Sequence, residues 1–148
     1  VIGDGNMVYP SYPYLKLWRD ALARFGQATD SFERIGIEKD KFYYPLEGQF
    51  CSEATLLSAI YILQVNKHIQ QVQIERVVGL NKIEMLKPHV YRRPYLVKID
   101  QSRVPALTRL SSRLGNVPVF LVSRPENAQT VECVADAILA QTEKLMLA

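Results

Sequence analysis

The first part of the chain combines short apolar runs with one stretch of helical spacing. Two β-prone runs, 1–3 and 7–9, flank Asp4-Gly5-Asn6, which predicts a tight hairpin because Gly and Asn tolerate positive φ. An amphipathic helix is predicted next, from Pro13 to a left-handed end at Gly26. Its apolar positions recur at helical spacing: Leu15, Trp18, Leu22 and Phe25.

Three further apolar runs are typical of strands. Phe42–Tyr44 is a short aromatic run, and 58–63 is almost continuously apolar, as expected of a strand covered on both faces. Val72–Val78 is expected to be the antiparallel neighbour of the 58–63 strand. Val117–Val122 predicts one more buried strand.

Helical spacing returns in three segments of the second half. Asn81 and Glu84 have the spacing of a capping box, so a helix is expected there. Residues 103–114 predict a second helix, and 127–147 predict a long one. The long helix has one expected apolar face, formed by Val131, Val134, Ala135, Ile138, Leu139 and Leu145. The pattern predicts a single α/β domain, residues 1–148, in which a mixed β-sheet is packed by amphipathic helices.

The composition is that of an ordinary globular domain. The 148 residues are 48% hydrophobic and 22% charged, which excludes disordered and collagen-like chains. The net charge of +3 is too small to indicate nucleic acid or a membrane surface as a partner. The longest apolar stretch is far shorter than the about 18 residues of a membrane span, and no secretory signal is visible. We therefore expect a cytoplasmic protein.

The cysteines and histidines give no sign of a metal site. Cys51 and Cys133 match neither a zinc spacing nor a disulfide framework, so both are expected to be reduced packing residues. His68 and His89 have no other ligand at metal-binding spacing. No metal ligand is predicted from these four residues.

Two cationic segments are the candidates for chemistry. In 36–42 the charges alternate ahead of the aromatic run, and a solvated turn is the simpler interpretation. In the alternative, Lys39 or Lys41 contacts a phosphate, since an ammonium on a long stem can follow a transferring phosphoryl group. Arg92 and Arg93 are either ordinary surface residues or a binding site for an anionic substrate.

Several motifs occur in a characteristic order. DGNMVYPSYPYLKLW spans residues 4–18, and Gly36-Ile37-Glu38-Lys39 is followed by Pro45-Leu46. Strand-like runs at 59–63 and 74–76 precede a Val-Pro-Val run at 117–119 with Arg-Pro beyond it. In this order the motifs resemble the C-terminal portion of HPr-kinase-like serine kinases, and the resemblance covers nearly the whole chain.

The resemblance implies a fold, a reaction and two site residues. The fold is that of the catalytic domain of HPr kinase and the nucleotide-binding part of phosphoenolpyruvate carboxykinase. The reaction is transfer of a phosphoryl group from ATP, with Mg²⁺, to a serine hydroxyl of a protein or peptide; some relatives act in lasso-peptide maturation. Lys39 matches a phosphate-proximal group of the family, and Lys41 is a weaker companion.

The chain departs from the family pattern at the nucleotide site. The GxxxxGK[ST] loop and the acidic pair precede the hairpin in that family, and no Gly-Lys dipeptide occurs here. The chain is thus expected to lack the N-terminal part of the catalytic domain, to bind ATP weakly alone and to contain no identified catalytic base. An uncovered sheet edge would then favour a homo-oligomer. The alternative is a non-catalytic module that binds a peptide or protein through a sheet edge or through Arg92 and Arg93.

Overall fold

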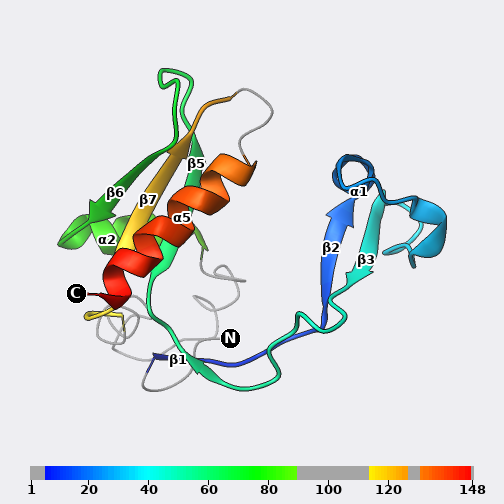
Figure 1. Ribbon diagram of the computed structural model, residues 1–148, viewed down its shortest axis with the longest axis horizontal. Helices are drawn as coiled ribbons and strands as arrows, with labels where there is room; N and C mark the ends of the chain where they lie inside the picture. The colour runs from blue at the N-terminus through cyan, green and yellow to red at the C-terminus, as the bar shows by residue number, and fades with distance from the viewer. Residues whose placement is uncertain (1–5, 90–113, 127–130, 148) are drawn as a thin grey trace, which may run out of the picture. The chain divides into compact units, whose positions relative to one another are not determined.

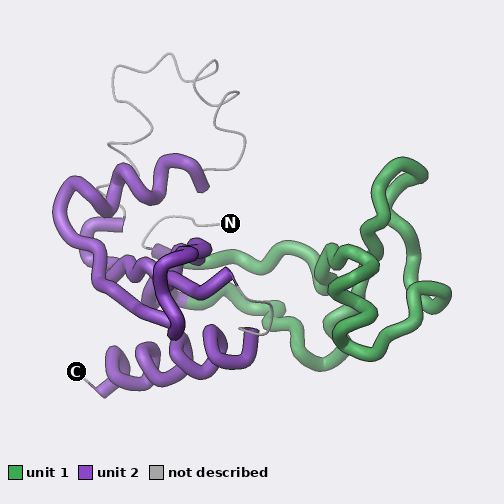
Figure 2. Tube along the Cα trace, turned by 90° about the horizontal axis from the view of Figure 1, so that it is seen from above, with its two compact units in different colours: residues 1–3, 7–55 green, residues 4–6, 56–148 purple. Residues whose placement is uncertain are grey.

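The computed structural model describes residues 6–89, 114–126 and 131–147, which form an α/β fold with mixed sheets and a few helices. Two compact units make up the chain, one mainly from residues 7–55 and one mainly from residues 56–148 (Figure 2). The predicted α/β class with a mixed sheet is therefore confirmed. That the whole chain forms a single domain stays a prediction.

Figure 1 labels the elements in chain order. The strands are β1 (Met7–Val8), β2 (Tyr14–Trp18), β3 (Lys41–Pro45), β4 (Thr55–Leu56), β5 (Ile60–Val65), β6 (Gln73–Val77) and β7 (Val119–Arg124). The helices are α1 (Arg19–Arg24), α2 (Leu80–Leu86) and α5 (Val131–Met146), with 3-10 turns at Thr29–Ser31 and Lys87–His89. None of these helices is long and apolar enough to cross a membrane.

The predicted N-terminal hairpin falls largely outside the described residues, which begin at Asn6. Asn6 has a φ of 60°, in agreement with the expected turn conformation. β1 pairs with β4 in a two-stranded sheet. The partner of Met7–Val8 within the described residues is therefore Thr55–Leu56.

The helix predicted from Pro13 is wrong in its first half. Residues 14–18 form β2, which runs antiparallel to β3, and only Arg19–Arg24 is helical. Tyr-Leu-Lys-Leu-Trp also fits a strand, because its aromatic and leucine side chains alternate with a period of two. Pairing with the aromatic strand β3 selects the strand period over the helical period for residues 14–18. Gly26 has a φ of 68°, as predicted for the helix end.

The sheet of the second unit has the order β5-β7-β6. β7 is parallel to β5 and antiparallel to β6. The prediction that β5 and β6 are direct neighbours is wrong, because β7 lies between them. The burial of the strands agrees with this order. Four of the six residues of the central strand β7 are buried, whereas the second half of the edge strand β5 is exposed.

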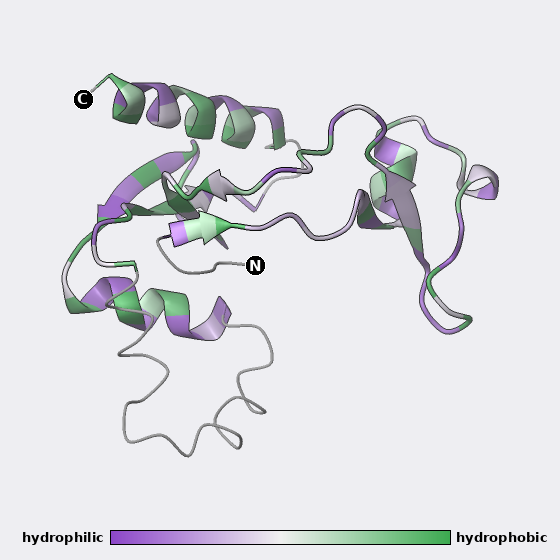
Figure 3. Ribbon diagram, turned by 90° about the horizontal axis from the view of Figure 1, so that it is seen from below, coloured by the Kyte–Doolittle hydropathy of each residue, from purple (hydrophilic) through white to green (hydrophobic). Residues whose placement is uncertain are grey.

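Helices cover both faces of this sheet, and Figures 1 and 3 show α5 on one side and α2 on the other. Toward α2 lies a core of Ile62, Leu86, Leu114, Val117 and Val119. Toward α5, the Tyr61 ring stacks on Phe120 with 5.3 Å between centroids, and the Tyr61 hydroxyl is hydrogen-bonded to Thr142 at 2.9 Å. The second unit is therefore a three-layer α/β/α arrangement.

The predicted apolar face of the long helix is correct in part. Val134 is buried and Ile138 and Leu145 are half-buried, whereas Val131, Ala135 and Leu139 are exposed. The apolar residues of α5 thus occupy more than the side that packs on the sheet, and Figure 3 shows green and purple stretches along this helix. The helix predicted at 103–114 lies outside the described residues, apart from the buried Leu114.

The capping box predicted at Asn81 and Glu84 is wrong, because α2 begins earlier. Gly79 is the N-cap residue, and no side chain caps the helix. Asn81 lies within the helix, and the Glu84 carboxylate is paired with Lys87 instead. Gly79 has a φ of 62° and a ψ of −144°, a conformation that is open essentially to glycine alone.

Replacing Gly79 by Ala is expected to lower the free energy of unfolding by about 1–3 kcal/mol. An added Cβ would meet nothing within 4 Å, so the cost is backbone strain and not a clash. Urea denaturation followed by circular dichroism measures it. Asn81→Ala is the control and should be nearly neutral. A loss at Asn81 equal to the loss at Gly79 would show that the asparagine caps the helix after all.

Candidate functional site

The candidate site lies on the antiparallel ribbon of β2 and β3 in the first unit. Leu17 is paired with Phe42, Lys16 with Tyr43, and Trp18 with Lys41. Successive strand side chains point to opposite faces, and directly paired residues share a face. One face therefore carries Leu15, Leu17, Phe42 and Tyr44. The other carries Tyr14, Lys16, Trp18, Lys41 and Tyr43, and we call it the aromatic–lysine face.

The apolar face fixes the ribbon in its register. Phe42 is only 4% exposed, Leu17 is half-buried, and Leu22 of α1 is completely buried. A slip of one residue would turn these apolar side chains to the solvent. Burial on this side therefore keeps the aromatic–lysine face turned outward.

On the aromatic–lysine face, cations lie against rings across the two strands. The Lys41 ammonium is 4.4 Å from the centroid of the Trp18 ring, and the Lys16 ammonium is 5.6 Å from that of Tyr43. Tyr14 meets Tyr43 edge-on at 4.7 Å and stacks on Tyr12 at 5.3 Å. Cation–π contacts and ring packing restrict the rotamers of these long side chains. The face thus presents ordered positive charge above aromatic surface.

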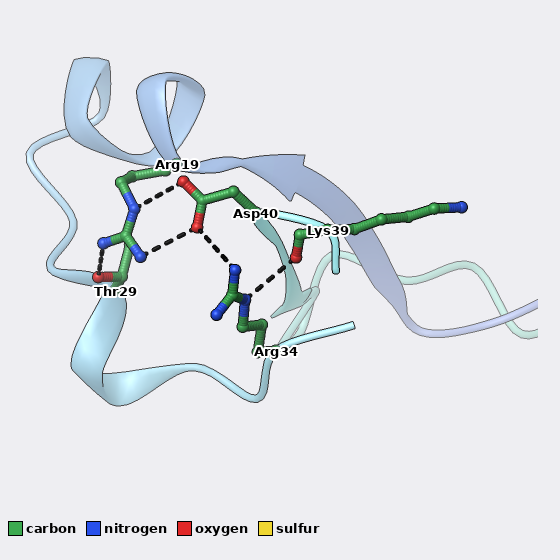
Figure 4. Close-up of polar contacts among 5 residues, drawn as sticks. All are labelled: Arg19, Thr29, Arg34, Lys39 and Asp40. Atoms are coloured by element: carbon green, nitrogen blue, oxygen red, sulfur yellow. Dashed lines mark hydrogen bonds and ion pairs between the residues drawn. The ribbon is translucent and has the colours of Figure 1, made fainter. Parts of the chain in front are cut away.

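Next to this face, Asp40 lies at the centre of a polar network (Figure 4). Arg19 donates two hydrogen bonds to the Asp40 carboxylate, from Nε at 2.8 Å and from Nη2 at 3.0 Å. The third nitrogen of Arg19 donates to the Thr29 hydroxyl at 2.7 Å. Arg34 lies 3.7 Å from the carboxylate and donates to the Lys39 carbonyl at 3.1 Å. One carboxylate is thus matched by two guanidinium groups.

The network shifts the pKa of Asp40 below its ordinary value, because the hydrogen bonds from Arg19 stabilise the carboxylate, and the charges of Arg19 and Arg34 add to this. The pKa of Arg19 is raised in turn, chiefly by the hydrogen bond to Asp40. A lowered carboxyl pKa stabilises the fold above the unfolded pKa of about 3.9. This contribution disappears as the pH falls through the lower, folded pKa.

Asp40→Asn is therefore expected to destabilise the first unit at pH 7 and to change nothing below the lowered pKa of Asp40, where the native side chain is itself protonated. Urea midpoints followed by the fluorescence of Trp18, the only tryptophan of the chain, measure the difference. Asp20→Asn is the matched control, since Asp20 is exposed and its ion pair within the described residues is with Arg24 of the same helix, at 3.8 Å. Equal pH profiles for native and Asp40→Asn proteins would contradict the stabilising role of the network.

The structure places the predicted phosphate-binding lysines on either side of Asp40. Figure 4 shows the Lys39 side chain extended away from the carboxylate and from both arginines. The Lys41 side chain lies over Trp18 on the aromatic–lysine face. Since Arg19 and Arg34 already neutralise Asp40, its carboxylate does not cancel the charge of the two lysines.

The other predicted site residues have different outcomes. Arg92 and Arg93 lie outside the described residues, so substrate binding by them stays a prediction. Cys51 and Cys133 are free thiols, but both are exposed, so their predicted role in packing is wrong. In the described ranges, no three His, Cys, Asp or Glu side chains gather where they could hold a metal.

The second unit offers a separate, shallow hollow of about 290 Å³ between β6 and α2. Its lining includes Glu75, Arg76, Val77, Val78, Asn81, Glu84, Met85 and Leu121. Lys82, also in α2, donates two hydrogen bonds, to the carbonyls of Leu114 and Gly115 at 2.5 and 3.0 Å. Burial, and then the charge of Arg76, lowers the pKa of Lys82. Neither Lys39 nor Lys41 lines the hollow.

Comparisons with known proteins add no relative: no family model matches the sequence, and neither a curated protein nor a solved structure matches it. The function is therefore inferred from the ribbon of β2 and β3 and from the sequence motifs. It combines ordered ammonium groups, exposed aromatic rings and a neutralised carboxylate.

Sequence reasoning missed the residues that organise this site. Arg19 and Asp40 are 21 residues apart, and neither stands in a recognisable motif. Helical spacing places Trp18 on the apolar face of a helix, whereas in the structure it lies half-exposed beside Lys41. The available signal was the alternation of aromatic and lysine residues at 14, 16, 18, 41 and 43, which has the period of a strand.

Proposed function

We propose that this chain belongs to an ATP-dependent serine kinase that acts on a protein or peptide, and that Lys39 contacts the transferred phosphate, with Lys41 as a weaker companion. The observation that carries the proposal is the pair of lysines around a carboxylate already bound by Arg19 and Arg34. The sequence motifs of HPr-kinase-like enzymes support it, since Lys39 matches their phosphate-proximal group.

Phosphoryl transfer needs little covalent chemistry from a protein. The transferred group spreads negative charge over its equatorial oxygens, and catalysis consists of positioning and charge stabilisation. Lys39 is suited to this because its ammonium extends away from Asp40 (Figure 4). Lys41 is less free, since its ammonium is held over the Trp18 ring at 4.4 Å. Lys39 is therefore the residue to which we assign the phosphate contact.

The described residues fit the nucleotide only in part. Two lysines offer phosphate contacts, but no acidic cluster in the described segments fits Mg²⁺. ATP supplies the phosphoryl group when bound, and in this proposal the described residues contribute phosphate contacts but neither the glycine-rich loop nor the metal ligands. The role of the chain is to orient the phosphate and the acceptor.

The fold and the thiols agree with this proposal. A mixed sheet between helices suits the expected likeness to the catalytic domain of HPr kinase and the nucleotide-binding part of phosphoenolpyruvate carboxykinase. Two exposed free cysteines agree with a reducing, cytoplasmic compartment. The proposed partner is a protein or peptide that carries an acceptor serine.

A second candidate function is a non-catalytic peptide-binding module. The aromatic–lysine face favours it, because half-exposed rings such as Trp18 and Tyr12 offer binding area without any nucleotide. The two functions share this surface and differ in whether a phosphoryl group is transferred.

The test is a transfer assay with the protein made from its complete reading frame, ATP labelled in the γ-phosphate, Mg²⁺ and a library of serine-centred peptides. We expect label to appear on serine and to require the glycine-rich loop. No transfer, together with a reading frame that encodes no such loop, would leave the peptide-binding module as the function.

A further inference from the structure

The charge of the first unit is unevenly distributed. Residues 7–55 contain six Lys and Arg against seven Asp and Glu, so the unit as a whole is not basic. Among the residues of β2 and β3, the aromatic–lysine face nevertheless carries two lysines and no acid. Glu33 lies beside it, along the other edge of β3, where its carbonyl accepts a hydrogen bond from the Tyr43 N–H at 2.9 Å. The nearest acid in sequence, Asp40, is engaged by Arg19 and Arg34. The strand residues of this face therefore have a net positive charge, although the unit as a whole does not.

A local charge of this kind suits a short anionic segment better than a nucleic acid. Nucleic-acid binders neutralise many phosphates through a broad basic surface, and single strands need free ring faces for base stacking. Here one face of Trp18 is covered by Lys41, and Tyr14 is stacked on Tyr12. Both requirements are poorly met.

The spacing of the two lysines fits an extended peptide. Lys16 is opposite Tyr43 and Lys41 is opposite Trp18, so the lysines are diagonal neighbours on adjacent strands. Diagonal neighbours lie about 7–8 Å apart. Alternate side chains of an extended chain repeat at about 6.8 Å. Acidic residues at positions i and i+2 of a bound segment can therefore meet both ammonium groups.

We propose that the aromatic–lysine face binds an extended acidic segment of the acceptor peptide, with carboxylates at alternate positions. The naming of this segment as the acceptor rests on the proposed function, whereas the binding itself does not. The lysines lie over rings that shield them on one side, which strengthens their attraction to a carboxylate on the other. Tyr12 and Trp18, both half-exposed or more, supply apolar contact beside the charges.

Binding is measured by calorimetry on the full chain without nucleotide, and the fluorescence of Trp18 provides a second reading. The probe is a synthetic peptide of alternating Glu and Thr. A peptide of the same composition with contiguous glutamates, a Lys-Thr peptide and an oligo-dT strand are compared with it. We expect the alternating acidic peptide to bind most tightly and the Lys-Thr peptide not to bind.

Lys16→Gln combined with Lys41→Gln should weaken binding of the alternating peptide about tenfold. The conservative pair Lys16→Arg and Lys41→Arg should retain it, which separates loss of charge from loss of folding. Lys144→Gln, an exposed lysine in the last turn of α5, is the matched control and should change nothing.

Three outcomes would overturn the inference: equal affinity for alternating and contiguous acidic peptides, tighter binding of oligo-dT with a steep salt dependence, or unchanged affinity in the double Gln variant. Failure of the kinase is seen separately. If the acidic peptide binds but no phosphoryl transfer occurs, the peptide-binding surface is supported and the enzymatic function is refuted. If transfer occurs but the acidic peptide does not bind, the enzymatic function is supported and the peptide-binding surface is refuted.

Discussion

Phe120→Ala is expected to lower the free energy of unfolding of the second unit by about 3–5 kcal/mol. Phe120 is 4% exposed and lies in β7, between the partner residues Tyr61 and Arg76 of the two flanking strands. Its ring stacks on Tyr61 at 5.3 Å. The truncation therefore removes a large apolar area and leaves a cavity between the sheet and α5.

Leu63→Ala in β5 is the matched control for this prediction. Leu63 is 56% exposed and lies in a strand at the edge of the sheet. Its truncation should cost less than about 1 kcal/mol. Urea denaturation followed by far-ultraviolet circular dichroism compares the two variants. Equal losses at the two positions would contradict the central place of β7.

The strands of the second unit were predictable from the sequence, but their order was not. Continuous apolar runs marked β5 and β7, because a strand covered on both faces needs apolar residues on both. Neighbouring strands in sequence usually pair, which favoured a β5–β6 hairpin. The insertion of β7 depends on pairing between residues such as Ile62 and Leu121, far apart in the chain. Local spacing carries no information about that contact.

The first unit shows how one segment can satisfy two periods. Leu15, Trp18 and Leu22 have helical spacing, and the helix expected from them exists only after residue 18. Residues 14–18 also alternate as a strand does, and β3 supplies a partner in register. Tertiary pairing thus outweighed the local preference, as is common for short amphipathic segments.

The candidate site was predictable only as a list of charged residues. Lys39 and Lys41 stood out because their charges alternate beside an aromatic run. Their surroundings come from cross-strand contacts: Trp18 beneath Lys41, and Arg19 on Asp40. Because of these contacts, the Asp40 carboxylate between the two lysines is neutralised. The lysines also differ in position, since the Lys41 ammonium lies over the Trp18 ring and the Lys39 side chain extends away from Asp40.

In the proposed kinase, Lys39→Ala is expected to lower kcat for phosphoryl transfer about 100-fold, in line with the loss of one preorganised charge-stabilising donor. KM for the acceptor peptide should change little, since in the proposed role the ammonium acts on the phosphate and not on the peptide. Lys41→Ala should have a smaller effect on kcat, because its ammonium lies over the Trp18 ring. Transfer of labelled phosphate under saturating ATP measures these rates.

Two comparisons separate this role of Lys39 from a structural one. Lys39 contributes only its backbone carbonyl to the Arg34 network, so Lys39→Ala should leave the urea midpoint of the first unit unchanged. Lys144→Ala, in the last turn of α5, should change neither kcat nor stability. Lys39→Arg keeps the charge and should recover part of the rate, because charge stabilisation tolerates a different cation better than its loss. An unchanged kcat in the Lys39→Ala variant would show that Lys39 does not contact the phosphate. The positive charge of the ribbon would then serve peptide binding through Lys16 and Lys41 alone.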